Sequence, residues 1–214
     1  MSPWEKILKE FESQGLKIQT WFKPDRVAAY KPFHRNERLS AAYVASRLQY
    51  EPDTGHLRWK ALPGVSPAER AWNGKFAGKI AGCKSGHNVQ INLLVEGKQF
   101  GFRAHRIAWA LMTGEWPDGL VDHKDGDTFN NKWANLRSSD HSSNGCNAAH
   151  MGGECPFKGV SPYGLGFRAQ ATRYGETWCV SGFRTPEQAA DAYDRMATVL
   201  HGEFAKTNRE MGLL

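Results

Sequence analysis

The sequence predicts an α+β protein in which small antiparallel sheets alternate with single helices. Short runs of alternating apolar and polar residues, separated by turn residues, fill 50–104 and are typical of hairpins. Apolar residues at helical spacing follow in 105–113 and recur in 185–200. Between these patterns, residues 151–156 read Met-Gly-Gly-Glu-Cys-Pro, which is typical of a linker. We therefore expect a folded domain on each side of this linker.

Residues 1–49 are expected to form an N-terminal helical and basic segment. Apolar residues at helical spacing predict helices at 4–14 and 39–48. The stretch between them combines Lys and Arg with Pro, and it is either an arm that contacts DNA or an ordinary solvated loop. The loop is the interpretation we favour. The segment carries no motif, so the sequence assigns it no role.

The segment 50–104 is expected to form hairpins and a small antiparallel sheet. The turn Pro52–Gly55 interrupts the strand-like run Tyr50–Trp59, and its glycine accepts a positive φ at little steric cost. Residues 89–93 alternate between apolar and polar types, as in a half-buried strand. The turn at 96–98 then reverses the chain into a further strand.

A helix expected over 105–113 leads into a densely polar stretch. An apolar strand that starts at Leu120 stops at Asp122 and His123, directly before a Lys-Asp-Gly-Asp turn. Neighbouring residues on a strand point to opposite faces. The carboxylate and the imidazole can therefore serve one site only if the strand ends there and bends.

A helix is expected to follow the second strand of this hairpin. Ser138 or Ser139 can cap it, and it continues to about Cys146, which carries Asn144 back toward the end of the first strand. Carboxylate and amide oxygens suit Mg²⁺, which keeps several water ligands. A neutral imidazole accepts a proton from water near pH 7. These are the residue types that phosphodiester hydrolysis requires.

The motifs in this stretch resemble the HNH, or ββα-metal, endonucleases of the phage homing type. The matching elements are His105-Arg106 with Trp109, Val121-Asp122-His123-Lys-Asp-Gly-Asp, Asn130-Asn131, Asn135-Leu136-Arg137 and Asn144. The similarity begins at the hairpin that starts with Tyr50 and continues to about Asn147. It places an HNH nuclease domain at 50–150.

The resemblance implies a role for each matching residue. Asp122 and Asn144 correspond to the ligands of one divalent metal ion, Mg²⁺ or alternatively Mn²⁺. His123 corresponds to the general base that activates water. Asn135 corresponds to the central asparagine that holds the ββα loop by hydrogen bonds. The metal would stabilise the leaving 3′ oxygen as a Lewis acid.

Other polar residues near this motif have simpler interpretations. Asp125 and Asp127 belong to an Asp-Gly-Asp sequence and are interpreted as turn formers rather than as carboxylates that support the metal ligands or repel substrate. His105 could act as a second catalytic histidine, but its position at a helix start favours a structural role.

The C-terminal segment 157–214 shows three strand-like runs followed by one amphipathic helix. Thr185 is the expected N-cap, Pro186 occupies the first helical position and Gln188 completes a capping box. The sequence resembles the APETALA/ethylene-response-factor DNA-binding domain. The resemblance implies a three-stranded antiparallel sheet that lies in the major groove and packs on one helix.

Charge is distributed unevenly over this segment. Residues 157–184 have a net charge of +3 and residues 185–206 a net charge of −2. The strands, rather than the helix, are therefore expected to face phosphate. The candidate DNA contacts are Arg168 and Arg173, with Lys158 and Arg184 behind them.

The composition favours a polyanionic partner. The formal net charge is +6 and the isoelectric point is about 9.2. The sequence shows no signal peptide and no apolar run long enough to span a membrane. The four cysteines are far apart and form no Cys-x-x-Cys pair, so we expect reduced thiols and a cytoplasmic location.

The sequence therefore predicts a site-directed, metal-dependent endonuclease that hydrolyses double-stranded DNA as a monomer. The nuclease domain would cut, and the C-terminal domain would recognise the target. A phage homing role follows from the resemblance only. The main alternative is a DNA-binding regulator that keeps an inactive HNH domain as a scaffold. A further alternative, a structural zinc protein, would use Cys146, Cys155, His141 and His150.

Overall fold

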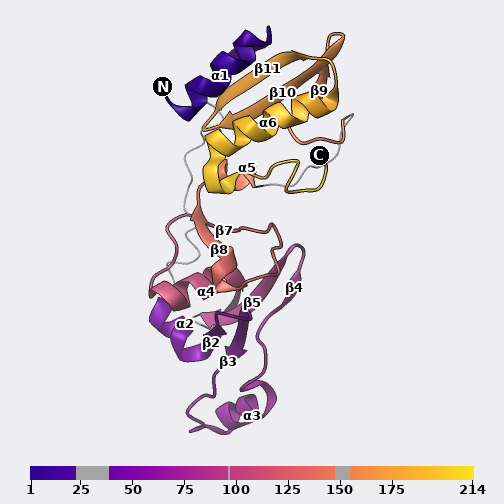
Figure 1. The fold of residues 1–214 in the computed structure, drawn as a ribbon. Helices are drawn as coiled ribbons and strands as arrows, with labels where there is room; N and C mark the ends of the chain where they lie inside the picture. The colour runs from indigo at the N-terminus through magenta and orange to yellow at the C-terminus, as the bar shows by residue number, and fades with distance from the viewer. Residues whose placement is uncertain (23–38, 96, 148–154) are drawn as a thin grey trace. The chain divides into compact units, whose positions relative to one another are not determined.

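The computed structural model describes residues 1–22, 39–95, 97–147 and 155–214 (Figure 1). The chain divides into two compact units, one made of Met1–Tyr30 with Asp140–Leu214 and the other of Lys31–Ser139. We call the first the discontinuous unit and the second the inserted unit. Most of the expected linker and the basic middle of the N-terminal segment lie outside the described residues. The mixture of helices and small antiparallel sheets confirms the α+β class.

The discontinuous unit contains one sheet and its helices. Its elements are α1 (Pro3–Ser13), β1 (Lys17–Phe22), α5 (His141–Cys146), β9 (Val160–Tyr163), β10 (Gly166–Arg173), β11 (Glu176–Phe183), α6 (Pro186–His201) and the 3-10 helix η4 (Gly202–Phe204). The strand order is β1-β11-β10-β9, with all neighbours antiparallel. The expectation of three strands was therefore wrong, because β1 from the N-terminal segment pairs along β11 from Lys17↔Ser181 to Phe22↔Glu176.

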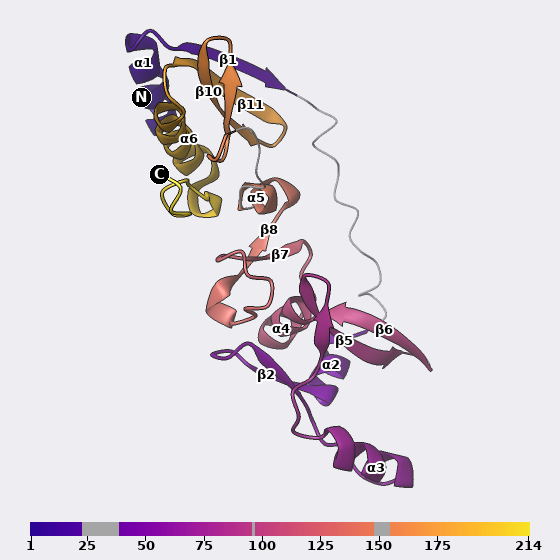
Figure 2. The same ribbon diagram turned by 90° about the vertical axis from the view of Figure 1, so that its right-hand side faces the viewer.

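Two helices pack on the same face of this sheet (Figure 2). The core contains Phe11 of α1, Ala169 and Val180 of the strands, and Met196 of α6, all of them buried. The expected capping box of α6 is confirmed, since the Thr185 hydroxyl accepts from the amide of Gln188. One face of the sheet is covered by the apolar faces of these helices, as is common for antiparallel sheets.

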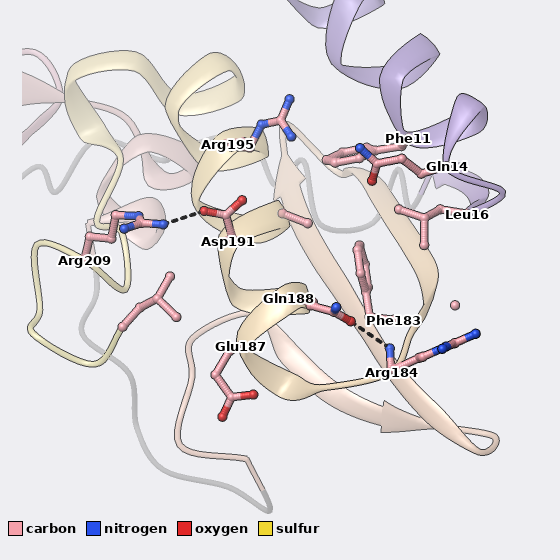
Figure 3. A pocket seen from close by; sticks show the side chains of 13 residues that line it. Phe11, Gln14, Leu16, Phe183, Arg184, Glu187, Gln188, Asp191, Arg195 and Arg209 are labelled. Carbon is pink, nitrogen blue, oxygen red and sulfur yellow. Dashed lines mark hydrogen bonds and ion pairs between the residues drawn. The ribbon is translucent and has the colours of Figure 1, made fainter.

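A pocket of about 780 Å³ lies within the discontinuous unit where α1 and β11 meet α6 (Figure 3). Three of the charged residues that line it, Asp191, Arg195 and Arg209, take part in ion pairs. Arg195 donates to Glu10 of α1 at 3.0 Å, and Arg209 donates to Asp191 at 2.6 Å. These ion pairs join the two ends of the chain to α6.

The inserted unit contains three small sheets and three helices. Its elements are α2 (Ala41–Arg47), β2 (Leu48–Glu51), β3 (His56–Trp59), α3 (Pro67–Phe76), β4 (Cys83–Ser85), β5 (Asn88–Val95), β6 (Lys98–Arg103), α4 (Ala104–Thr113), β7 (Leu120–His123), the 3-10 helix η3 (Trp133–Asn135) and β8 (Leu136–Ser139). The sheets are β2-β3, β4-β5-β6 and β7-β8. The buried core joins Leu48 and Leu57 of the first hairpin to Ile91 of β5 and Ile107 of α4.

Most elements of the inserted unit match the sequence pattern. The helix expected at 105–113 is α4, and it ends at Gly114, whose φ of 83° is left-handed. The expectation of hairpins throughout 50–104 was wrong for 67–76, which form α3. Ser66 and Glu69 form a capping box there, and Pro67 starts the helix. These residues are a local helix signal within a stretch whose other patterns indicate hairpins.

The boundaries of the two compact units differ from the domain boundaries that the sequence suggested. Residues 1–22 belong with the C-terminal sheet, and residues 39–49 belong with the nuclease-like segment. The boundary after 139 falls directly between β8 and α5, so α5 belongs to the discontinuous unit. The physical reason is that β1 pairs with β11 and α5 contacts β10, and both partners lie far from them in the sequence.

In the part of the chain that the structure describes, no helix combines the length and the apolar character needed to cross a membrane.

The conformation of Gly159 gives a stability prediction. Its φ is +72°, and a Cβ built there would lie 2.0 Å from the ring of the buried Tyr193. Gly159→Ala should therefore lose about 1–2 kcal/mol from the left-handed backbone and a further amount of about 1–3 kcal/mol from overpacking. Chemical unfolding measures the loss.

Gly164→Ala is the matched control for this substitution. Its φ is +61°, but nothing lies within 4 Å of the added Cβ. It should lose only the backbone contribution, and equal losses in the two variants would contradict the proposed clash with Tyr193.

Candidate active site

The β7-β8 hairpin places the candidate site residues of the inserted unit. In its register Asp122 is opposite Arg137 and His123 is opposite Leu136. β7 ends at His123, and the next residue, Lys124, already donates its amide to the carbonyl of Asn135. The strand therefore ends at the position where the sequence required a bend.

Asp122 forms a buried ion pair across this hairpin. Its Oδ2 accepts from Nε of Arg137 at 3.0 Å and lies 2.9 Å from Nη2 of the same residue. Both side chains are less than a tenth exposed. Burial of this carboxylate is tolerable because a guanidinium compensates its charge. The sequence contained both residues, but only the strand register brings them together.

His123 is buried and its ring has a defined orientation. Its Nε2 lies 3.0 Å from Oδ1 of the buried Asn131, whose Nδ2 in turn donates to the carbonyl of Phe129. Because an amide oxygen can only accept, Nε2 carries the proton and Nδ1 carries the lone pair of the neutral ring. Asn131 thus selects the tautomer of His123. The sequence motif contained Asn131 but gave it no role.

His105, at the start of α4, packs against this imidazole. The two ring centroids are 5.0 Å apart and the rings are nearly perpendicular. Burial, together with the neighbouring His123, lowers the pKa of His105 to about 3. A neutral ring packed in this way fits the structural interpretation. The adjacent Arg106 donates to the carbonyls of Pro117 and Gly119 and so braces the entry to β7.

A network of side-chain amides holds the loop between the two strands. Asn135 donates from Nδ2 to Oδ1 of Asp125 at 2.9 Å and to the carbonyl of Asn130 at 2.8 Å, and its Oδ1 accepts the amide of Asp125. Burial opposes ionisation of Asp125, but the hydrogen bonds from Asn130 and Asn135 outweigh it and lower its pKa. Asp127 accepts the amide of Phe129, as a turn former does.

The first hairpin supports this loop from outside. The hydroxyl of Tyr50 donates to the carbonyl of Asn131 at 2.6 Å, and burial raises the pKa of Tyr50 to about 12. Gly55, with φ of +76°, lies so close that a Cβ would be 2.6 Å from the backbone of Asn131. The Pro52–Gly55 turn therefore fixes the backbone of the residue that orients His123.

Asn144 is exposed on α5 and belongs to the discontinuous unit, whereas Asp122 and His123 belong to the inserted unit. The expected cap, Ser138 or Ser139, was wrong. β8 continues through Ser139, and Asp140 caps α5 by accepting the amide of Ser143 at 2.7 Å. The pairing of Asn144 with Asp122 stays a prediction.

The β10-β11 turn and the end of α6 hold α5 in its unit. The hydroxyl of Tyr174 donates to Asp140 at 3.1 Å, and the amide of Tyr174 donates to Ser142 at 2.8 Å. Tyr174 is the one described residue other than glycine with a positive φ, 49°. At the other end of the helix, Cys146 Sγ lies 3.1 Å from Nδ1 of His201.

The four candidate DNA contacts do not share one surface. Arg168 lies on the sheet face opposite α6, where its guanidinium donates to Ser161 and stacks over Tyr163. Arg173 points to the other face and donates to the carbonyl of Leu200 at the end of α6.

The remaining two candidates lie away from the strands. Lys158 is half-buried and donates to the carbonyl of Cys146 at 2.7 Å, and burial lowers its pKa. Arg184 is exposed beyond the end of β11. Arg168 is thus the candidate whose position best fits contact through the sheet.

No group of three or more His, Cys, Asp or Glu side chains that could hold a metal ion occurs among the residues with described positions. Two of the four residues named for a zinc site, Cys146 and Cys155, are buried free cysteines. His150 lies outside the described residues, as does the side chain of His141.

Comparison with known proteins defines the class of the β7-β8 segment. Residues 102–146 match the family model described as HNH endonuclease. The matching range starts on β6, includes α4 and the whole β7-β8 hairpin, and ends with α5. This part of the chain is therefore similar to HNH endonucleases.

The chain is also similar to two known proteins. An uncharacterized HNH endonuclease of Acanthamoeba polyphaga mimivirus is 32% identical over 128 residues, which is 59% of this chain and 64% of that protein. The chain therefore spans less than two thirds of this relative. The solved structure of DNA binding and cleavage by the HNH homing endonuclease I-HmuI matches 44% of this chain and 47% of its own, with 26% identity and a TM-score of 0.31.

Asn131→Ala should release the tautomer of His123. The buried Nε2–H would lose its acceptor, so both neutral tautomers should be populated and the free energy of unfolding should fall by about 1–3 kcal/mol. The ¹⁵N chemical shifts of the His123 ring, measured by NMR above pH 8, report the tautomer. Asn130→Ala is the control, because that side chain bonds to Asp125 instead. An unchanged Nε2–H tautomer in Asn131→Ala would contradict this role.

His105 should make stability depend on pH. The folded protein keeps its imidazole neutral down to about pH 3, whereas the unfolded chain protonates near pH 6.5. The unfolded state binds more protons in this window, so the contribution is complete above pH 6.5 and is lost as the pH falls.

His105→Gln should therefore flatten the pH dependence of the unfolding free energy between pH 6.5 and 4, by up to about 1.4 kcal/mol per pH unit. Chemical unfolding at a series of pH values measures the slope. His56→Gln, at an exposed histidine, is the control. If the two variants show the same slope as the wild type, the depressed pKa is refuted.

Proposed function

We propose that this protein is a metal-dependent DNA endonuclease that hydrolyses phosphodiester bonds. The observation that carries the proposal is the environment of the buried His123. Asn131 holds this ring in the tautomer whose Nδ1 can accept a proton. His123 directly follows Asp122, in a segment that matches the HNH endonuclease family.

The donor set suits a hard divalent cation. Asp122 offers a carboxylate and Asn144 an amide oxygen, and Mg²⁺ is typically bound by one or two such protein ligands together with water and substrate phosphate. We propose that these two residues hold one Mg²⁺ or Mn²⁺ ion. Bound there, the ion would supply Lewis-acid stabilisation of the charge that develops on the leaving 3′ oxygen.

His123 supplies the base chemistry in this proposal. Its Nδ1 takes a proton from the water that attacks phosphorus, and the bond from phosphorus to the 3′ oxygen breaks. The imidazolium that forms keeps its Nε2–H directed at the oxygen of the Asn131 side chain. Asn135 is a positioning residue in this proposal. It fixes the loop that carries Asp125, and this loop lies beside both strands.

The discontinuous unit is proposed to bind double-stranded DNA and to supply target recognition. Arg168 on the strand face supports this role, and the net charge of +3 in 157–184 is of the sign that phosphate attracts. When two weak binding modules are joined in one chain, binding of one module to DNA raises the effective concentration of the other module at the same DNA. Specificity then need not come from the nuclease residues. A homing role in a phage or mobile element, and action as a monomer in the cytoplasm, complete the proposal.

Conversion of supercoiled plasmid DNA tests this function. The wild-type protein in Mg²⁺ should produce open-circular or linear DNA, and EDTA should abolish the product. His123→Ala should lower the rate by about 100-fold or more, because general-base catalysis contributes about 100- to 10,000-fold. His56→Ala, an exposed histidine of the same unit, should cut like the wild type.

Two results would contradict the endonuclease. Equal cutting by His123→Ala and the wild type would place the activity elsewhere, for example in a contaminating nuclease. A wild-type protein that retards DNA in a gel but leaves every plasmid and phage or host genome intact would instead favour the regulator with an inactive HNH domain.

A further inference from the structure

The sheet of the discontinuous unit has one face that carries no helix in the described residues (Figure 2). Ile18, Ala169 and Val180 belong to the core on the α1 and α6 side. Side chains alternate along a strand, and directly paired residues share a face. Their neighbours therefore form the opposite surface, which we call the open face.

The open face consists of three cross-strand rows. Each row is read from β1 across β11 to β10. The first row is Lys17, Ser181 and Arg168, continued by Ser161 on β9; the second is Gln19, Cys179 and Gln170; and the third is Trp21, Thr177 and Thr172. Tyr163, at the end of β9, lies on the same face. The three β11 residues have small, buried side chains. The flanking side chains from β1 and β10 are longer and reach solvent.

The chemistry of this face differs from that of α6. It contains no Asp or Glu, whereas residues 185–206 carry a net charge of −2. Lys17 and Arg168 lie in one row, two strand spacings or about 10 Å apart. The next row presents two glutamines. Cations position a protein on phosphates, while Gln and Arg are the side chains that read adenine and guanine edges.

We propose that β1 is part of the DNA-contacting surface, with Lys17 on phosphate and Gln19 on a base edge beside Arg168 and Gln170. The occupant is duplex DNA, because a carboxylate-free face with two cations and two amides complements the charge and base edges of a groove. The inference rests on the proposed endonuclease function. It assigns a role to an N-terminal segment for which the sequence had suggested none.

The test measures DNA binding by the full-length protein in EDTA, where the proposed cleavage is blocked. The probe is a set of 30-bp duplexes that the wild type selects from a random pool, with affinities measured between about 50 and 200 mM salt. Lys17→Ala should weaken binding to all duplexes and lower the slope of log K against log salt by about 0.9, the value for one phosphate contact.

Gln19→Ala should leave the salt slope unchanged and alter base preference. The expected loss is about 5- to 150-fold in discrimination at one base pair, the range for a good bidentate contact. Lys9→Ala on α1 is the charge-matched control, and Thr20→Ala on the opposite face of β1 is the strand-matched control. Both controls should bind as the wild type does.

Three results separate the possibilities. If Lys17→Ala and Gln19→Ala bind like the wild type while Arg168→Ala is weakened, β1 does not contact DNA and the inference fails, but the proposed function stands. If Lys9→Ala lowers the slope as much as Lys17→Ala, the effect is general charge and the inference also fails. A wild type that neither binds any duplex nor cuts plasmid overturns the proposed function itself.

Discussion

The antiparallel pairing of β7 with β8 is the constraint on which the candidate active site depends. It ends the first strand at His123, sets Asp122 opposite Arg137, and starts the second strand next to Asn135. The buried side chains of Asp122 and His123 then have partners across the hairpin and in its loop. Because unpaired buried polar groups cost about 1–3 kcal/mol each, the loop is held in one conformation by its own hydrogen bonds.

The surroundings of this hairpin act on its backbone more than on its side chains. Tyr50 bonds to the carbonyl of Asn131, and Gly55 allows the first hairpin to approach the same peptide. On the other side, the neutral ring of His105 fills space against His123. The inserted unit thus holds the imidazole between Asn131 and His105. The helix α5, which carries Asn144, is held by Tyr174 and His201 within the discontinuous unit.

Local signals in the sequence predicted much of this. The Gly114 stop, the Thr185 capping box and the two strands around the Lys-Asp-Gly-Asp turn each depend on residues close in sequence. The Ser66 capping box was an equally local signal that the hairpin-rich context obscured. The strand β1 and its pairing with β11 were not predicted, because nothing local to residues 17–22 indicates a partner so distant in the sequence. The Asp122–Arg137 ion pair likewise could not be predicted without the register of β7 against β8.

The contiguity of β8 and α5 has a consequence for the modularity of this molecule. β8 ends at Ser139 in the inserted unit and α5 follows Asp140 in the discontinuous unit, whose sheet also includes β1. A chimera joined at 151–156 would separate α5 from the sheet that it contacts and would leave the β11 edge without β1. Transfer of the discontinuous unit to another protein would therefore require moving its N-terminal and C-terminal parts together.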